Sequence, residues 1–427
     1  MRLEPEARQL REAVECDISD AVDPPPHRRL AAARGDIPLW RGRECAAGLP
    51  DPARTTYRSP SGSCIDTGMA TNSARASAAQ YAARLVATVD APLDPASADA
   101  PEVRHWPGRE LLVQRGDTEL VVRDLDGPGA VVRFPAPWPR RFGSMAVSPE
   151  ADLAVFAGVH GLQAVDPTGA VRWEVRHGCW SAAVCTDAHT SFAEYADDYY
   201  HGHADSGSAA FSSDGKLLWA HVRNYAGEDV EEEWLILDPA DGRVLARAET
   251  MTVGSGSFHS PHPDPAYMAL TVGEGDEDSP VLWGHWDGAK FSIQRFVEEV
   301  FLAASPSGEH LVATDPRQWA LYLRRAEDGV ELGRLNAAEA VPQSGDDRPR
   351  WAYEAAFPDD DTIVAGIENA AGVPGHWLVD ARTMTLRGRI DYPFPVSGSP
   401  RSAGRGTWYT GADDRTALHL WSLPHGG

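Results

Sequence analysis

Short apolar runs separated by polar turns recur along most of the chain, and Gly207–Val222 (GSAAFSSDGKLLWAHV) shows the repeating unit clearly. This stretch predicts a strand, a tight turn and a second strand, because runs rich in apolar and aromatic residues bounded by Gly, Ser and Asp are typical of β-hairpins. Equivalent turns are centred on Pro107, Pro149, Ser213, Pro261, Pro306, Pro358 and Pro400. Their spacings of 42 to 64 residues, with several strands in each repeat, predict a β-propeller.

The strands that follow each turn indicate how the ring closes. Predicted second strands lie at 110–116, 152–158, 217–223, 267–273, 310–316, 362–368 and 407–413. The last repeat ends at its third strand, Leu418–Leu423, whereas Ala83–Asp90 is a predicted strand that belongs to no repeat. Because a closed ring leaves no free sheet edge, we expect Ala83–Asp90 to complete the last blade. The predicted fold is all-β, a seven-bladed propeller of four-stranded antiparallel blades; six and eight blades remain open alternatives.

Residues 1–68 do not share this pattern. They contain a Pro24-Pro25-Pro26 run and an Arg/Ala/Gly-rich stretch, and they lack sustained apolar periodicity. Such a segment buries too little apolar surface to offset the entropy of ordering it. Met69 opens a second potential start, so we interpret 1–68 as a disordered tail or an over-extended reading frame, 69–82 as a linker and 83–427 as the propeller domain.

The repeats resemble the WD40 and YVTN-type seven-bladed propellers over roughly residues 83–427. LHLWSL and VLWGHWDG approximate the third-strand signature of that superfamily, and the turns SPEAD, SSDGK and SPSGE approximate its first turn. The Gly-His pair and the Trp-Asp ending of true WD repeats are missing in most copies. The resemblance implies the fold and a docking role for a protein or ligand, and it transfers no functional residue.

The charge of the chain restricts its partners. Residues 69–427 hold 29 basic and 52 acidic residues, whereas 1–68 hold 10 and 11. A domain this acidic repels phosphate groups, so nucleic acid and anionic membranes are poor partners. Basic proteins, cationic ligands or divalent cations fit better, although acidity also serves solubility alone. With no secretory signal and no long apolar run, we expect a cytoplasmic, monomeric protein.

Ligand-type side chains are concentrated between the second and third turns, and they raise the question of a metal site. This segment holds Cys179, Cys185, His177, His189, His201, His203 and Asp205. Zinc favours such residues, but six residues of extended strand would separate Cys179 from Cys185 by roughly 20 Å. No CxxC or HxxxH pair is present either, and none of the acidic loops has the spacing of a calcium loop. We therefore expect reduced thiols, no metal and no cofactor.

The irregular loops of the predicted propeller all lie on one face. That face carries the insertion 176–206, 224–233, 273–280, 336–350 and 368–375, and function concentrates on long loops held by a rigid scaffold. Within the insertion, the spacing of Ser191 and Glu194 predicts a short helix over Phe192–Tyr200. The candidate binding residues are His177 and His201 of the insertion, His203, Asp205 and His259 at the expected mouth of the central channel, and Arg348 and Arg350 at the start of a first strand.

Two functions fit these observations. The chain contains no nucleophile elbow, phosphate-binding loop or dinucleotide fingerprint, so no catalytic residue is assigned. We expect a non-enzymatic scaffold that docks a protein partner or small ligand on its acidic, irregular face. The alternative is a hydrolase or lyase that uses His203, Asp205 and His259 at the channel mouth, with or without a metal.

Overall fold

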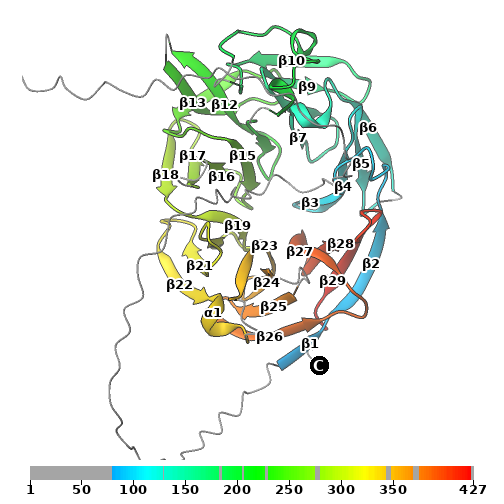
Figure 1. Ribbon diagram of the computed structural model, residues 1–427, viewed down its shortest axis with the longest axis vertical. Coiled ribbons are helices and arrows are strands. Elements are labelled where there is room, and N and C mark those ends of the chain that lie inside the picture. The colour runs from blue at the N-terminus through cyan, green and yellow to red at the C-terminus, as the bar shows by residue number, and fades with distance from the viewer. Residues whose placement is uncertain are drawn as a thin grey trace, which may run out of the picture. The chain divides into compact units, whose positions relative to one another are not determined.

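The computed structural model describes residues 79–424, apart from 128, 182–184, 204–205, 227–228, 275–278, 343–347 and 369–374. In this part of the chain the strands form seven sheets arranged as blades around a ring (Figure 1). The segment predicted to be a disordered tail or over-extended reading frame, 1–68, and residues 69–78 of the predicted linker lie outside the described residues. Among the described residues, no helix is long and apolar enough to cross a membrane.

The first five blades each consist of four consecutive antiparallel strands. Blade 1 contains β3 (Glu102–Trp106), β4 (Arg109–Arg115), β5 (Glu119–Asp124) and β6 (Val131–Pro135). Blade 2 contains β7 (Gly143–Val147), β8 (Ala154–Gly158), β9 (Gly161–Val165) and β10 (Val171–Arg176). Blade 3 contains β11 (Ala209–Phe211), β12 (Leu218–Ala226), β13 (Asp229–Leu237) and β14 (Val244–Glu249). Blade 4 contains β15 (Gly256–Pro261), β16 (Tyr267–Gly273), β17 (Val281–Trp286) and β18 (Phe291–Phe296). Blade 5 contains β19 (Val300–Ala304), β20 (His310–Thr314), β21 (Ala320–Arg325) and β22 (Glu331–Asn336).

The last two blades contain the N-terminal strands. Blade 6 contains β23 (Arg350–Asp359), β24 (Thr362–Glu368), β25 (Gly375–Asp380) and β26 (Thr385–Asp391), with β1 (Ala79–Ala82) added parallel to β26. Blade 7 contains β27 (Ser397–Gly404), β28 (Thr407–Gly411), β29 (Ala417–Ser422) and, outermost, β2 (Arg84–Asp90). Because β2 pairs antiparallel with β29, the predicted closure by the N-terminal strand is confirmed. The described helices are short: η1 (Arg140–Phe142), η2 (Phe192–Glu194), η3 (His201–His203) and α1 (Ala337–Ala340).

Tryptophans fill the spaces between neighbouring blades. Trp219 and Trp234 of blade 3 pack against Met268, Leu270 and Leu282 of blade 4. The approach is close: a Cβ added at Gly284 would lie 2.8 Å from ring atoms of Trp234, which explains glycine at that position. Five tryptophans on the strands are buried in this way, namely Trp219, Trp234, Trp283, Trp377 and Trp421.

Two details of the predicted repeats are wrong. Pro400 lies inside β27, and the turn falls instead at Gly404–Thr407, where Gly404 and Gly406 have φ of 80° and 76°. Proline is tolerated there because the pairing with β28 shifts register between Ser397 and Arg401, a bulge that needs no ladder hydrogen bond from its nitrogen. The helix expected over Phe192–Tyr200 is only the single 3₁₀ turn η2, because Glu194 accepts hydrogen bonds from Thr190 rather than forming a capping box with Ser191.

Antiparallel blades divide the connections between two faces. Turns between first and second strands and between third and fourth strands share one face, which we call the turn face. Loops between second and third strands and those joining blades share the other, which we call the loop face. The longest connection on the loop face is the insertion, residues 177–208, between β10 and β11.

Candidate functional site: the insertion and the loop face

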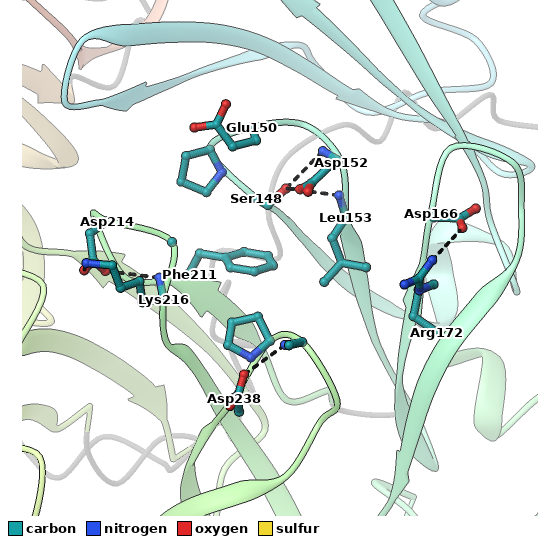
Figure 2. Close-up of a pocket in the computed structure, with 14 residues that line it drawn as sticks. Ser148, Glu150, Asp152, Leu153, Asp166, Arg172, Phe211, Asp214, Lys216 and Asp238 are labelled. Atoms are coloured by element: carbon teal, nitrogen blue, oxygen red, sulfur yellow. Dashed lines mark hydrogen bonds and ion pairs between the residues drawn. The ribbon is translucent and has the colours of Figure 1, made fainter.

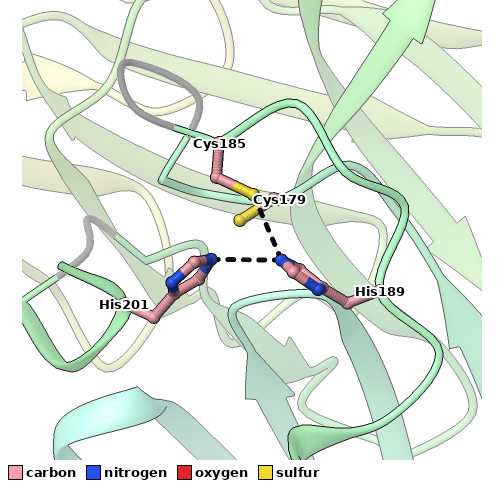
Figure 3. Close-up of side chains that lie close together, drawn as sticks. All are labelled: Cys179, Cys185, His189 and His201. Atoms are coloured by element: carbon pink, nitrogen blue, oxygen red, sulfur yellow. Dashed lines mark hydrogen bonds between the residues drawn. The ribbon is translucent and has the colours of Figure 1, made fainter. Parts of the chain in front are cut away.

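Four side chains of the insertion meet at one point. The ligand atoms of Cys179, Cys185, His189 and His201 all lie within 4.8 Å of one another (Figure 3). The Nε2 atoms of His189 and His201 are 3.1 Å apart, and Cys185 Sγ lies 3.3 Å from His189 Nε2. The expectation that Cys179 and Cys185 are separated by roughly 20 Å is therefore wrong, and so is the ground on which a metal was excluded.

The local backbone explains why these residues converge. Cys179 lies between two backbone hydrogen bonds to neighbouring blades, from Gly178 N to Arg223 O (2.7 Å) and from Trp180 N to Val159 O (2.9 Å). The chain then reverses, because Cys185 N donates to Ser181 O at 2.8 Å. This hydrogen bond holds Cys185 close to Ser181, so the two sulfurs meet, whereas an extended strand would separate them.

Further turns return the chain to the cluster from the other side. Tyr195 N donates to Phe192 O at 3.2 Å, Asp198 N to Tyr195 O at 3.0 Å and Gly202 N to Asp198 O at 3.2 Å. These consecutive turns place His201, at the start of η3, opposite His189. The arrangement follows from tight loop geometry, so no strand or helix period in the sequence predicts it.

The remaining nitrogen of each histidine faces a carboxylate. His189 Nδ1 lies 3.3 Å from Glu194 Oε2, and His201 Nδ1 lies 3.1 Å from Asp198 Oδ2. A carboxylate beside Nδ1 favours the tautomer that carries its proton there, which leaves the lone pair on Nε2. Both lone pairs then point into the cluster.

The cluster is enclosed by protein. Cys179, His189 and His201 are buried, and the buried Tyr195 stacks on His201 with ring centroids 4.9 Å apart. The Tyr195 hydroxyl lies 2.5 Å from His160 Nδ1 of blade 2, which ties the insertion to the ring. Ser181 N donates to Cys179 Sγ at 3.3 Å, and burial raises the pKa of the Cys179 thiol. A group bound here would be held away from bulk water.

The predicted binding residues are divided among several places. His201 belongs to the cluster, whereas His177 bonds through Nδ1 to Gly178 O (2.8 Å) and lines an adjacent hollow of about 350 Å³. The side chain of His203 and all of Asp205 lie outside the described residues. Arg348 stacks on Trp319 at 5.0 Å, and Arg350 is exposed at the start of β23, so both lie between blades 5 and 6.

His259 occupies a packed position between blades. Its Nδ1 lies 2.8 Å from Ser208 Oγ, and its Nε2 accepts a hydrogen bond from Trp234 Nε1 at 2.9 Å. The side chain is buried, and burial holds its pKa well below the ordinary value. With both ring nitrogens already engaged, His259 acts in packing and is not placed to take a proton from a substrate.

A second buried network holds another part of the loop face. Glu232 of β13 accepts hydrogen bonds from Arg223 Nη2 (2.9 Å), Thr252 Oγ1 (2.7 Å) and Gly254 N (2.8 Å). His221 Nε2 lies 3.3 Å from the same carboxylate. This carboxylate therefore fixes the connection between β14 and β15, on which Met251 and Val253 are exposed.

The turn face carries a hollow of about 630 Å³ between blades 2 and 3 (Figure 2). Most of its acidic side chains are already used within their own turns, and Glu150 pairs with Arg109 of blade 1 at 3.3 Å. Asp166 accepts from Thr168 and Ala170, Asp214 from Lys216, and Asp238 from Ala240. The hollow is therefore the gap between turns whose acidic side chains are already hydrogen-bonded. For this reason the loop face remains the better candidate for a functional site.

Sequence reasoning named His201 but dismissed Cys179, Cys185 and His189. The signal was the pattern Cys-x5-Cys-x3-His-x11-His confined to one insertion, which places four ligand-type residues within 23 positions. Their spacing matched no regular element, and only the turns of the folded loop bring them together.

The comparisons with known proteins agree with this architecture. Neither the protein-family models nor the curated protein sequences gave a match. Among solved structures, the β-propeller domain of Cps50 (Swd1) from Myceliophteria thermophila is similar with a TM-score of 0.50 and 11% identity, covering 80% of this chain and 100% of that one. U3-55K is similar with a TM-score of 0.49 and 10% identity, covering 80% of this chain and 98% of that one. The RRP9 WD40 repeats are similar with a TM-score of 0.46 and 10% identity, covering 79% of this chain and 99% of that one.

The ring of four-stranded blades closed by an N-terminal strand defines the chain as a seven-bladed β-propeller. Most of its repeats lack the signature residues of WD40 repeats. At 11% identity the likeness concerns the fold alone.

Proposed function

We propose that this protein is a non-enzymatic binding propeller that docks a partner protein on the part of the loop face formed by blades 2 to 4. The observation that carries the proposal is a group of exposed apolar and aromatic side chains on that sector. Tyr199 and Tyr200 of the insertion are 71% and 62% exposed, and Met251 and Val253 are 72% and 79% exposed. Exposed groups of this kind, displayed on loops that buried networks hold in place, are typical of protein interfaces.

The charge of the same sector indicates the chemistry of the partner. The insertion contains five acidic residues and no lysine or arginine. Residues 273–280, which connect β16 to β17, contain four acidic residues and again no basic one. Opposite charge steers association and fixes register, and tyrosine faces also attract lysine and arginine. The favoured partner is therefore a protein with an exposed Lys/Arg-rich segment.

The experiment compares variants on two surfaces. Tyr199→Ala combined with Tyr200→Ala removes aromatic surface from the insertion, and Val171→Ala combined with Val330→Ala removes exposed apolar surface elsewhere. The probe is a labelled peptide of alternating arginine and leucine, with a glutamate-leucine peptide as the charge control. Loss of two interface aromatics is expected to cost about 2 kcal/mol, which is about 30-fold in affinity.

The result expected is binding of the basic peptide that weakens with salt, falls about 30-fold in the tyrosine variant and is unchanged in the valine variant. Equal binding of both peptides, or equal affinity of both variants, would contradict the proposed docking surface. Partner proteins captured from a lysate should then depend on the same two tyrosines.

A further inference from the structure

We propose that Cys179, Cys185, His189 and His201 form a closed tetrahedral zinc site that fastens the insertion to the propeller. The site would be structural, because four protein ligands leave no position open for water or substrate. The existence of the zinc site does not depend on the proposed docking function. Tyr199 and Tyr200 directly precede His201 in the chain, so the site would also position these docking residues, and that part of the inference rests on the proposed function.

The distances between the ligand atoms agree with such a site. In a tetrahedron with zinc–nitrogen bonds near 2.05 Å and zinc–sulfur bonds near 2.3 Å, two nitrogens lie about 3.3 Å apart and a nitrogen and a sulfur about 3.6 Å apart. The corresponding separations here are 3.1 Å between His189 Nε2 and His201 Nε2, and 3.3 Å between Cys185 Sγ and His189 Nε2. The fourth ligand atom, from Cys179, lies within the same 4.8 Å group. A zinc ion therefore fits after shifts of a few tenths of an ångström for the His189, His201 and Cys185 atoms and of up to about 1 Å for Cys179 Sγ.

The orientation of both histidines is a separate observation that favours a cation. Glu194 and Asp198 each lie beside the Nδ1 atom that faces away from the cluster, at 3.3 Å and 3.1 Å. Histidines that bind metal commonly donate this second N–H to a carboxylate, which orients the ring and increases its basicity. Two nitrogen lone pairs then face each other at 3.1 Å, an arrangement that a cation between them stabilises.

The ligand set and its burial select the metal. Thiolate and imidazole together suit zinc, whereas calcium and magnesium require oxygen ligands. Binding of Zn²⁺ by two thiols and two neutral imidazoles releases two protons and gives a centre with no net charge. A neutral centre is compatible with the buried positions of Cys179, His189 and His201.

The site would control the shape of the insertion. The described residues between Cys179 and His201 contain only one 3₁₀ turn, η2, and they pack on the ring through Trp180, Phe192 and Tyr195. Four ligands spread over 23 residues join its start, middle and end at one point. The zinc site would thus hold Tyr199 and Tyr200 in a fixed place on the loop face, which deepens the docking proposal.

The first test is the metal content of the full-length protein, purified with a reductant and without chelators and then exposed to zinc. We expect one zinc per chain by mass spectrometry of the digested metal. Cobalt in place of zinc should give the absorption of a tetrahedral centre with thiolate ligands. Cys185→Ser and His201→Asn should lose the metal, whereas His177→Asn, a nearby histidine outside the cluster, should retain it.

A positioning variant makes the test sharper. Glu194→Gln keeps all four ligands and removes the carboxylate beside His189 Nδ1. Loss of such a partner is expected to weaken zinc binding about 10- to 100-fold without abolishing it, measured by competition with a chelator of known affinity. Circular dichroism of the same variant shows whether it is folded. Weaker zinc binding by a folded Glu194→Gln variant then reports the loss of the carboxylate and not a general folding defect.

The outcomes that would overturn the site are distinct from those that test docking. No zinc or cobalt bound by folded wild-type protein would overturn it, as would a Cys179–Cys185 disulfide that persists under reducing conditions. A chelator should also expose residues 177–208 to limited proteolysis in the wild type, and unchanged cleavage would contradict the fastening role. A protein that binds zinc but not the basic peptide refutes the docking proposal alone, and the reverse result refutes the zinc site alone.

Discussion

Glu232 offers a quantitative test of how the loop face is held in place. Its carboxylate is almost fully buried and pairs with Arg223 while accepting hydrogen bonds from Thr252 and Gly254. Burial alone raises the pKa of this carboxyl, but hydrogen bonds and charge from His221, with further bonds from Thr252 and Arg223, lower it to about 2. These contacts favour the ionised form only in the folded protein.

Two independent routes give the size of the effect. The difference between an unfolded pKa of 4.5 and a folded value of about 2 corresponds to about 3 kcal/mol. Removal of one partner from a buried ion pair costs about 3–5 kcal/mol. At roughly 2 cal/mol/K per residue for a ring of about 350 residues, a loss of 3 kcal/mol lowers Tm by about 4 °C.

The variant to measure is Glu232→Gln, which preserves size and removes the charge. We expect a Tm about 4 °C lower than the wild type by scanning calorimetry at pH 7. Glu231→Gln is the matched control, because it removes one charge from the neighbouring, less buried position of β13, and its Tm should change by less than about 1 °C.

The pH dependence provides the second readout. Because the folded pKa of Glu232 lies below the unfolded value, its stabilisation is complete above about pH 4.5 and is lost as the pH falls towards about 2. The Tm difference between wild type and Glu232→Gln should therefore narrow across that range. If Glu232→Gln and Glu231→Gln have the same Tm at pH 7, the assigned role of the buried carboxylate is refuted.

Two further predictions concern the far side of the ring. Tyr392→Phe removes the hydroxyl that accepts a hydrogen bond from Trp408 Nε1 (2.9 Å) and lies 2.7 Å from His376 Nδ1, so we expect a loss of about 1–3 kcal/mol in urea unfolding. Removal of residues 1–68, which leaves a chain that begins at Met69, should leave Tm unchanged. Removal of residues 1–90 deletes β2 and exposes the edge of β29, so it should lower Tm sharply.

Each of these predictions has its own control. Tyr200→Phe removes a hydroxyl from an exposed side chain and should leave the free energy of unfolding unchanged. An equal effect of Tyr392→Phe and Tyr200→Phe would contradict the role given to the Tyr392 hydroxyl. Equal Tm values for the two truncated chains would contradict closure of the ring by β2, and a large loss on removing 1–68 would contradict the proposed domain boundary.

The agreement between pattern and structure was best for regular strands. Tyr267–Gly273 and Thr362–Glu368 were predicted to the residue, because apolar runs bounded by Gly, Asp and Pro determine strands locally. Closure by β2 was also predictable, since a ring with an incomplete last blade must take its fourth strand from elsewhere. Pro400 misled the alignment because a bulge inside β27 accommodates proline as well as a turn does.

The sequence by itself determined the repeat and favoured seven blades with the irregular loops on one face, because these depend on the alternation of short apolar runs and turns. Only the tertiary structure decided which side chains meet. Consecutive turns bring Cys179, Cys185, His189 and His201 within 4.8 Å, although no regular period relates them. His259, a plausible base by position, is instead held between Ser208 and Trp234 of the adjoining blade. Contacts of this kind join distant or irregular segments, so they follow from packing and not from local pattern.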